Sequence, residues 1–308
     1  MSNKYQKTLS KEINFAGIGL HSGKETSIKI LPADENTGIV FKRIDLIKNN
    51  FVEANYRNVT STKLCTTLEN NYGVKVSTVE HLLAAFYITG VDNALVEIDN
   101  EEVPIMDGSA KNFLVELNKI QIVEQTKKRK YLKIFKKIEF TENNKIISIE
   151  PNESSFQVEF ELNYKNKVIG NQKNEINFQE NDLKDISESR TFCLHQDIEK
   201  IKKLGLAKGG SLENAVIVDE DKVINKGGLR NTKEFVNHKI LDLAGDFFLS
   251  GYRILGKVVC IGGGHELSNL FLRKIFKSNE SFRIIDNNEI KSSRSFQVKK
   301  LESLVVNA

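Results

Sequence analysis

His238, Asp242 and Asp246 recur at every fourth position of the segment 237–246. Side chains four residues apart lie above one another on a helix, so this spacing predicts a polar stripe on one helical face. Most other positions of the segment are apolar, which predicts that the stripe lies against the protein core. Burying an imidazole and two carboxylates is costly unless a metal ion or protons compensate their charge. We therefore expect the chemistry of the chain to be located on this helix.

His238 and Asp242 supply two potential metal ligands from one helix, with the spacing of the two histidines in HExxH zinc enzymes. A third ligand has to come from elsewhere in the chain, and His81 is the natural candidate. Two imidazoles and one carboxylate leave a fourth position open for water, as a catalytic zinc site requires. The same spacing also occurs in hydrogen-bonded surface pairs, so the spacing alone leaves both interpretations open.

Glu80 and His265 are further candidates with two interpretations each. Ser77-Thr-Val-Glu80 matches a capping box, in which the glutamate bonds to the backbone at the start of a helix, and the sequence alone favours this role. Glu80 can act in catalysis only if the start of that helix faces the metal. His265 follows three glycines in a turn that either makes a tight connection or delivers the histidine to a site.

The composition describes an ordinary globular protein of 308 residues, with 40% hydrophobic and 28% charged residues and a formal net charge of +4. No cluster of basic and aromatic residues indicates nucleic-acid binding. The cysteines, Cys65, Cys193 and Cys260, form no CxxC pair, so neither a disulfide framework nor a zinc ribbon is indicated and a cytoplasmic location is expected. The sequence shows no signal peptide and no membrane-spanning run, and the basic run 127–130 is expected to be a solvated linker.

The order helix, strand, loop, helix occurs once in each half of the chain. In the first half, short strands precede a helix from about Ser77 to a stop at Gly90, and the second helix covers 109–118. In the second half, the long helix covers about 232–250, and the last helix covers 267–276. We predict an α+β fold of two related two-layer α/β sandwich domains, 1–126 and 127–308, with the active site between them and a partly disordered tail after Lys277.

Five segments between Gly17 and about Phe276 carry motifs of one enzyme family: STVEHLLAA at 77–85, VPIMDGSA at 103–110, SRTF at 189–192, FVNHKILD at 235–242 and GHxLxN at 264–269. In these motifs, which occur in the family's order, the chain resembles the UDP-3-O-acyl-N-acetylglucosamine deacetylases. The resemblance implies a zinc-dependent amidase that removes the N-acetyl group of UDP-3-O-acyl-N-acetylglucosamine, the committed step of lipid A biosynthesis.

The resemblance also implies the roles of individual residues. The metal, Zn²⁺ or alternatively Fe²⁺, would be held by His81, His238 and Asp242, and zinc would lower the pKa of a bound water toward ~7. Catalysis would use Glu80 as general base, the Thr191 hydroxyl to stabilise the oxyanion, and His265, held protonated by Asp246, to protonate the leaving amine.

For the substrate, the resemblance implies that Lys239 contacts a phosphate or carbonyl group and that Tyr164 stacks on uracil. An insert at about 193–225 would form the passage for the acyl chain. Further substrate contacts would come from Cys65, Phe192, Leu194 and Gly210. The candidate lining of the passage also includes Ile198, Ile201, Leu204, Ala207, Ala215 and Val216.

The chain departs from the family pattern at Glu266 and Ser268, where alanine and asparagine are usual, and at Asn237, where arginine is common. An acid next to His265 predicts a higher pKa for that histidine. Two other classes compete with the deacetylase: a non-haem Fe(II) oxygenase, which uses the same ligand types, and a nucleotide-sugar binding protein without turnover. We further expect a monomer, no nucleic-acid partner and no stable membrane insertion.

Overall fold

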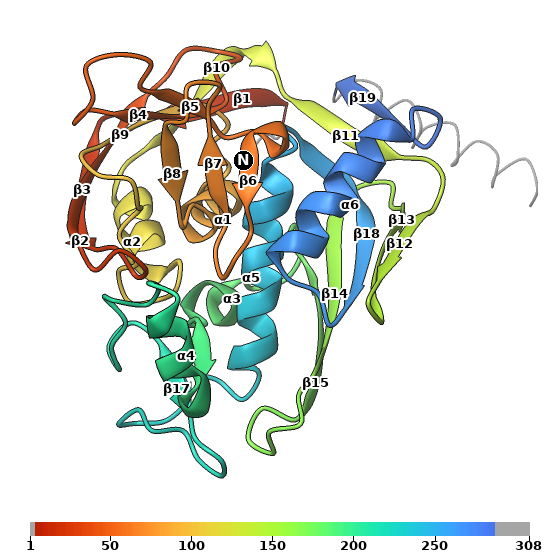
Figure 1. The fold of residues 1–308 in the computed structure, drawn as a ribbon. Helices are drawn as coiled ribbons and strands as arrows, with labels where there is room; N and C mark the ends of the chain where they lie inside the picture. The colour runs from red at the N-terminus through yellow and green to blue at the C-terminus, as the bar shows by residue number, and fades with distance from the viewer. Residues whose placement is uncertain (1–3, 287–308) are drawn as a thin grey trace, which may run out of the picture.

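The computed structural model describes residues 4–286 and confirms the predicted α+β fold (Figure 1). The first half of the chain forms a five-stranded sheet in the order β2-β3-β9-β4-β5, with two helices beside it. A small three-stranded sheet precedes the first helix. The bounds are β2 (Ile13–Ile18), β3 (Glu25–Pro32), β4 (Ile39–Arg43), β5 (Phe51–Glu53), β6 (Val59–Ser61), β7 (Thr67–Glu69), β8 (Lys75–Ser77), α1 (Glu80–Thr89), β9 (Ala94–Ile98) and α2 (Lys111–Lys119).

The second half forms a seven-stranded sheet in which β18 is central. Its members are β11 (Lys130–Ile134), β12 (Ile138–Glu142), β13 (Lys145–Pro151), β14 (Phe156–Asn163), β15 (Asn171–Asn177), β18 (Arg253–Ile261) and β19 (Phe282–Asp286). The remaining elements are α3 (Lys184–Glu188), β16 (Phe192–Leu194), α4 (Ile198–Lys203), β17 (Val216–Val218), α5 (Glu234–Phe248) and α6 (His265–Lys277). A separate pair of strands, β1 (Tyr5–Leu9) and β10 (Ile122–Lys128), joins the two ends of the first half.

The two halves share a pattern of strand pairing. In the first, β9 lies between an antiparallel partner, β3, and a parallel partner, β4. In the second, β18 pairs in the same way with β13 and β14. One helix precedes and one follows the central strand in each half, so the sheet topology repeats. The exact domain boundary stays a prediction, and the proposed position between residues 126 and 127 falls inside β10.

Two local predictions are wrong. Ser77 does not cap α1, because Val79 is the N-cap residue and the Ser77 hydroxyl donates to the Glu101 carbonyl at 3.2 Å. The basic run is not a linker, because its residues lie in and between β10 and β11. Its three lysines are exposed, as expected, but Arg129 is 3% exposed and its Nε donates to Asp92 at 2.9 Å. A buried guanidinium requires such a partner.

The prediction of a partly disordered tail after Lys277 falls mostly on positions that the structure does not describe. Residues 282–286 form β19, which pairs with β11, and positions 287–308 lie outside the described residues. The helix stop at Gly90 is confirmed, since Gly90 has φ of 86° and its N–H bonds to the Phe86 carbonyl. None of the helices between residues 4 and 286 is both long enough and apolar enough to span a bilayer.

Helices α1 and α5 pack against each other between the two sheets, and this packing joins the halves (Figure 1). Their closest approach is at Gly245, where an added Cβ atom would lie 2.1 Å from the carbonyl oxygen of Glu80. Only glycine leaves room for a carbonyl group at this position. The approach brings the first turn of α1 against the polar stripe of α5. Buried hydrophobic residues of both halves form one continuous core around it.

We expect Gly245→Ala to lower the free energy of unfolding by about 1–3 kcal/mol, because the new methyl group forces the helices apart. Thermal unfolding measures the effect. Gly264→Ala is the matched control, since a Cβ atom there meets no atom within 4 Å, and the loss of the N-cap glycine of α6 should cost only about 0.5 kcal/mol. Equal unfolding temperatures for the two variants would contradict the role of Gly245.

Candidate metal and active site

His81, His238 and Asp242 form a buried group in which one ligand atom from each residue lies within 4.8 Å of the others. The Nε2 atoms of His81 and His238 lie 3.4 Å and 3.3 Å from Asp242 Oδ1. Neighbouring ligands in a tetrahedral shell with bonds of about 2 Å are separated by roughly 3.3 Å. The three side chains therefore have the spacing of ligands around one ion.

The polar contacts of these residues also fit a cation. Asp242 Oδ1 is buried and has no hydrogen-bond partner among residues 4–286, although such carboxylate oxygens are normally satisfied. Burial lowers the pKa of His238 to about 3, so its imidazole is neutral and able to bind a metal. His238 Nδ1 lies 3.1 Å from the Ser189 carbonyl, an outer contact that orients a ligand histidine.

Asp242 stays ionised despite its burial. Burial raises its pKa, but the ammonium group of Lys239, the hydrogen bond with His81 and the charge of His265 outweigh this effect and hold the pKa well below its usual value. Lys239 Nζ donates to Asp242 Oδ2 at 2.8 Å, which leaves Oδ1 directed at the two imidazoles. The group thus presents two imidazole nitrogens and one anionic oxygen, a donor set suited to a divalent transition metal.

Glu80 and His265 face each other beside this group. Glu80 Oε1 lies 3.6 Å from His265 Nε2, and Glu80 is 3% exposed. Burial raises the pKa of Glu80, while His265 and His81 oppose the rise. Burial lowers the pKa of His265, but the charges of Asp246 and Glu80 prevail and raise it to about 10. The pair therefore combines a carboxylate with a raised pKa and a protonated imidazole.

Asp246 connects these two residues to the α5 stripe. Its Oδ2 lies 2.9 Å from His265 Nδ1, and its Oδ1 accepts the Thr66 hydroxyl at 2.7 Å. The backbone N–H of Thr66 also donates to Glu80 Oε2 at 3.1 Å. Thr66 thus orients both carboxylates, a role that sequence reasoning missed. In the sequence, Thr66 stands next to Cys65, a predicted substrate contact, but no spacing pattern marks Thr66 itself as part of the site.

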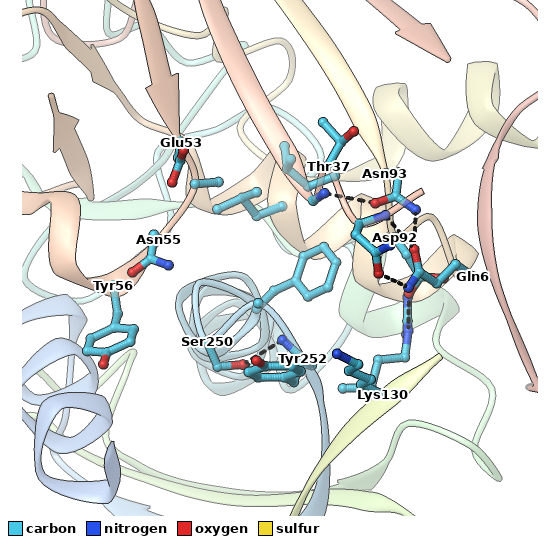
Figure 2. Close-up of a pocket in the computed structure, with 18 of the residues that line it drawn as sticks. Gln6, Thr37, Glu53, Asn55, Tyr56, Asp92, Asn93, Lys130, Ser250 and Tyr252 are labelled. Atoms are coloured by element: carbon cyan, nitrogen blue, oxygen red, sulfur yellow. Dashed lines mark hydrogen bonds and ion pairs between the residues drawn. The ribbon is translucent and has the colours of Figure 1, made fainter. Parts of the chain in front are cut away.

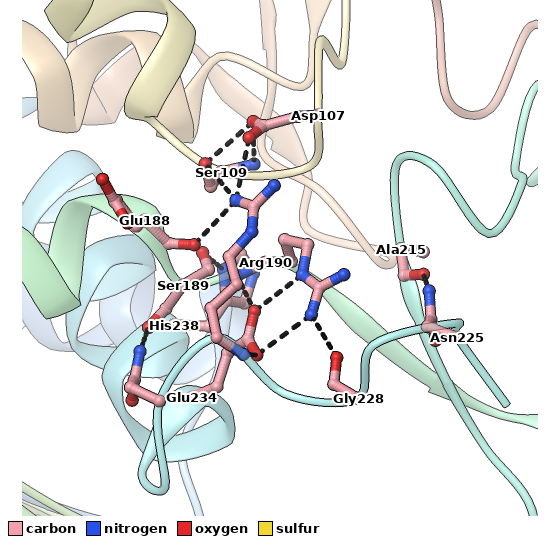
Figure 3. A network of polar contacts seen from close by, with 12 residues as sticks. Asp107, Ser109, Glu188, Ser189, Arg190, Ala215, Asn225, Gly228, Glu234 and His238 are labelled. Carbon is pink, nitrogen blue, oxygen red and sulfur yellow. Dashed lines mark hydrogen bonds and ion pairs between the residues drawn. The ribbon is translucent and has the colours of Figure 1, made fainter. Parts of the chain in front are cut away.

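A buried salt bridge holds the segment 189–191 next to the metal group, the cluster of His81, His238 and Asp242 (Figure 3). Glu234, in the first turn of α5, is fully buried, and its Oε1 accepts the Arg190 Nε at 2.8 Å. Its Oε2 accepts the backbone N–H of Arg230 at 2.6 Å. Because the Arg190 guanidinium compensates the buried charge of Glu234, the segment is fixed on the start of α5. Thr191 and the Ser189 carbonyl are thereby positioned.

The first half of the chain joins this network through Asp107. The Arg230 Nη1 donates to Asp107 Oδ2 at 2.8 Å and to the Glu188 carbonyl at 2.9 Å (Figure 3). Thr191 contributes to the same connection, because its backbone N–H donates to the Gly108 carbonyl at 2.8 Å. The network therefore fixes residues of both halves around the site.

Lys239, Phe192 and Tyr164 lie together at the side of the metal group. Lys239 Nζ lies 5.7 Å from the centre of the Phe192 ring, and the Tyr164 ring packs edge-on against Phe192 at 5.9 Å. Tyr164 is 36% exposed, so its ring is accessible from solvent. Cys65 is buried, and burial raises the pKa of its thiol to about 12, which keeps the thiol protonated.

An apolar cavity of about 380 Å³ opens beside the metal pocket, and the two share Leu20, Leu64 and Thr191. The insert supplies most of its lining. The predicted residues that line it are Phe192, Ile198, Ile201, Ala207, Gly210 and Ala215. Leu194, Leu204 and Val216 are not among its lining residues, and Val216 is buried in β17.

His21 also lines this cavity, and the sequence assigned it no role. It is 8% exposed, and its Nδ1 accepts the backbone N–H of Ala207 at 3.3 Å. This bond connects the turn that contains His21, in the first half of the chain, to the insert in the second half. Its place in a glycine-rich turn was the only signal, because a hydrogen bond across 186 residues leaves no local pattern.

A second cavity, of about 420 Å³, lies at the opposite end of α1 and α5 (Figure 2). Its lining is mostly polar and includes Gln6, Asn93 and Ser250. No histidine lines it, and its Asp92 is paired with Arg129 and Arg253. The smaller pocket at the metal group therefore holds the chemically active side chains.

Comparison with known proteins agrees with this geometry. The family model for UDP-3-O-acyl N-acetylglycosamine deacetylase matches residues 6–277. The chain is 41% identical over 280 residues to the UDP-3-O-acyl-N-acetylglucosamine deacetylase of Pseudoalteromonas translucida (strain TAC 125), covering 90% of this chain and 92% of that protein. The enzyme of the same name from Geotalea uraniireducens (strain Rf4) is 41% identical over 283 residues, covering 92% of each chain.

We expect Asp246→Asn to lower the pKa of His265 by about 1–3, because it removes the nearest negative charge. In the wild type, the raised value keeps His265 protonated until the pH approaches about 10, so the variant should lose this proton at lower pH. NMR titration of the imidazole resonances in metal-free protein measures the change.

Glu266→Ala is the control for this titration and tests the predicted effect of the neighbouring acid. Glu266 is exposed to solvent, and the largest charge effects on His265 come from Asp246, Glu80 and Asp242. The titration midpoint of His265 should therefore stay unchanged in this variant. An unchanged midpoint in Asp246→Asn would show that Asp246 does not hold the proton.

Proposed function

The chain belongs to the UDP-3-O-acyl-N-acetylglucosamine deacetylase family, and from this membership we propose which of its residues carry out the reaction. The protein is a hydrolase that deacetylates UDP-3-O-acyl-N-acetylglucosamine in lipid A biosynthesis. The convergence of His81, His238 and Asp242 with Glu80 and His265 is the observation that carries the assignment.

We assign Zn²⁺ to the group formed by His81, His238 and Asp242, with Fe²⁺ as the alternative ion. Two imidazole nitrogens and one carboxylate oxygen are the donors of catalytic zinc sites. The unpartnered Asp242 Oδ1 and the neutral His238 support a cation at this place. When bound, the ion supplies Lewis acidity toward the amide carbonyl and the attacking water.

The remaining steps are proton transfers and hydrogen bonds made by the protein. Glu80 accepts a proton from the water as the water oxygen adds to the acetyl carbonyl carbon. Burial raises the pKa of Glu80 toward neutral pH, which suits a general base. The Thr191 hydroxyl donates a hydrogen bond to the oxyanion that forms. His265 then protonates the amine nitrogen as the carbon–nitrogen bond breaks, releasing acetate and the free amine.

The substrate is proposed to bind along one continuous surface. The apolar cavity of the insert takes the acyl chain, and its shared lining with the metal pocket supports this arrangement. Lys239 contacts an anionic or carbonyl oxygen of the substrate, and the accessible ring of Tyr164 stacks on uracil. The expected monomeric state and cytoplasmic location stay predictions.

We expect chelation to abolish acetate release and one equivalent of Zn²⁺ to restore it. Glu80→Gln should keep the metal content of the wild type but lower kcat by about 10²–10⁴, because the proton acceptor is lost. Acetate release and metal analysis of the purified protein measure both effects. Glu101→Gln, a change of an exposed glutamate, is the control and should retain wild-type activity.

Each outcome separates the competing classes. Full activity of metal-free protein would contradict the assignment of the metal group, and wild-type kcat in Glu80→Gln would contradict the assignment of the base. Substrate binding without acetate release by the metal-loaded wild type would identify a binding protein. Restoration by Fe²⁺ but not by Zn²⁺ would overturn the choice of ion.

We expect Ala215→Leu to reduce kcat/KM for long-chain substrates roughly 10–100-fold relative to short-chain substrates. The larger side chain fills part of the cavity and excludes methylene groups that each contribute about 0.8 kcal/mol when buried. Competition between substrates of two chain lengths gives the ratio directly. Ala54→Leu, in the lining of the second cavity, should leave this ratio unchanged.

A further inference from the structure

The loop 164–170, between β14 and β15, is held in shape by one of its own side chains. Asn166 Oδ1 accepts the backbone N–H groups of Val168 at 2.9 Å and of Ile169 at 3.1 Å. An asparagine that bonds to the backbone a few residues further on stabilises a turn by itself. The Gly170 N–H donates to the Asn166 carbonyl at 2.8 Å and closes the loop. The side-chain oxygen of Asn166 is therefore used within the loop.

The amide nitrogen of the same side chain bonds to the insert. Asn166 Nδ2 donates to the backbone carbonyls of Asp219 at 2.9 Å and of Glu220 at 3.3 Å. Because the oxygen has two donors and the nitrogen has two acceptors, only one orientation of the amide satisfies all four contacts. Between residues 4 and 286, no other hydrogen bond joins the loop 164–170 to the insert. Asn166 is thus the polar link between these two segments.

The bonded carbonyls lie at the tip of the hairpin 216–224, which forms one wall of the apolar cavity. The Asp219 N–H donates to the Lys222 carbonyl at 2.9 Å and closes the turn at this tip. Ile217 and Ile224, on the two arms of the hairpin, both line the cavity. The Ile224 N–H donates to the Ile217 carbonyl at 2.9 Å. The link from the loop therefore supports the cavity wall at its tip.

The same loop carries Tyr164, the proposed contact for uracil. The Tyr164 ring packs edge-on against Phe192 at 5.9 Å. Phe192 lines the apolar cavity, and the centre of its ring lies 5.7 Å from Lys239 Nζ. Figure 1 shows the end of the β14–β15 hairpin and the insert together at the lower edge of the molecule. One loop is therefore in contact with both ends of the proposed substrate surface.

We propose that Asn166 is a positioning residue for chain-length specificity, because it holds the cavity wall and Tyr164 in the one arrangement that a long-chain substrate occupies. The proposal rests on the proposed function, which places the acyl chain in the cavity and uracil on Tyr164. A wall that is already held in its bound position loses less conformational freedom when a chain enters. A long chain fills more of the cavity than a short one, so the link favours long-chain substrates.

Asn166→Asp separates the link from the loop's own turn. A carboxylate still accepts the Val168 and Ile169 N–H groups, but it cannot donate to the two carbonyls of the insert. We expect the ratio of kcat/KM for long-chain over short-chain substrate to fall about 3–10-fold, the effect of losing one or two hydrogen bonds. A higher KM for the long-chain substrate should cause the fall. Because Asn166 does not line the metal pocket, kcat should stay within about twofold of wild type.

Asn163→Asp is the matched control. Asn163 is the last residue of β14, is exposed, and donates to Glu161 of the same strand at 3.2 Å. The variant therefore makes the same change of charge near the loop and leaves the link intact. It should keep the wild-type ratio. An unchanged ratio in Asn166→Asp, an equal fall in both variants, or a fall through kcat alone would overturn the proposal.

Hydrogen exchange gives a measurement that is independent of turnover. The backbone amides of Asp219 and Ile224 should exchange faster in Asn166→Asp than in wild type or Asn163→Asp, because the released hairpin opens more often. Equal exchange in all three proteins would show that Asn166 does not hold the hairpin.

Ala215→Leu distinguishes failure of this proposal from failure of the proposed function. If Ala215→Leu leaves the chain-length preference unchanged, the cavity is not the acyl site, and the role of Asn166 in specificity fails with that assignment. If Ala215→Leu lowers the preference but Asn166→Asp does not, the cavity assignment stands and the role of Asn166 alone is overturned.

Discussion

The close approach of α1 to α5 at Gly245 is the constraint on which the site depends. It places the Glu80 carbonyl where a Cβ atom would otherwise lie, so the first turn of α1 rests on the polar stripe of α5. Glu80 and His81 then meet His238, Asp242 and Asp246, although more than 150 residues separate the two groups. The first half supplies the proposed base and one proposed ligand, and the second half supplies the other two proposed ligands and the proposed acid. Neither half contains the site alone.

The burial required by this packing also sets the protonation states. Water is excluded from the stripe, and each ionisable group then depends on its nearest neighbours. Burial leaves His238 neutral, whereas Asp246 and Glu80 overcome burial at His265 and raise its pKa to about 10. Two histidines with opposite protonation states thus lie on either side of Asp242. The proposed metal ligand and the proposed proton donor are thus the same residue type, and their different neighbours set their different protonation states.

The sequence predicted those features that leave a local pattern. The four-residue spacing of His238, Asp242 and Asp246 correctly predicted one helical face, and the repeated element order indicated the topology. It failed where tertiary contacts override local signals. Ser77 to Glu80 matches a capping box, but the Glu80 carboxylate bonds to Thr66 instead. The roles of Thr66 and Arg129 depend on partners that the fold brings close from distant positions, so no spacing could reveal them.

The contacts that hold Thr191 are separate from those that shape the far wall of the apolar cavity. Thr191 lies in both the metal pocket and the apolar cavity, and it is held by the Gly108 carbonyl and by a segment anchored on Glu234. The contacts that orient Thr191 therefore come from the rigid body of the protein, whereas the far wall of the cavity comes from the insert. Under the proposed function, changes in the insert would therefore alter which acyl chains fit, whereas the proposed reacting groups would keep their positions because buried ion pairs outside the insert fix them.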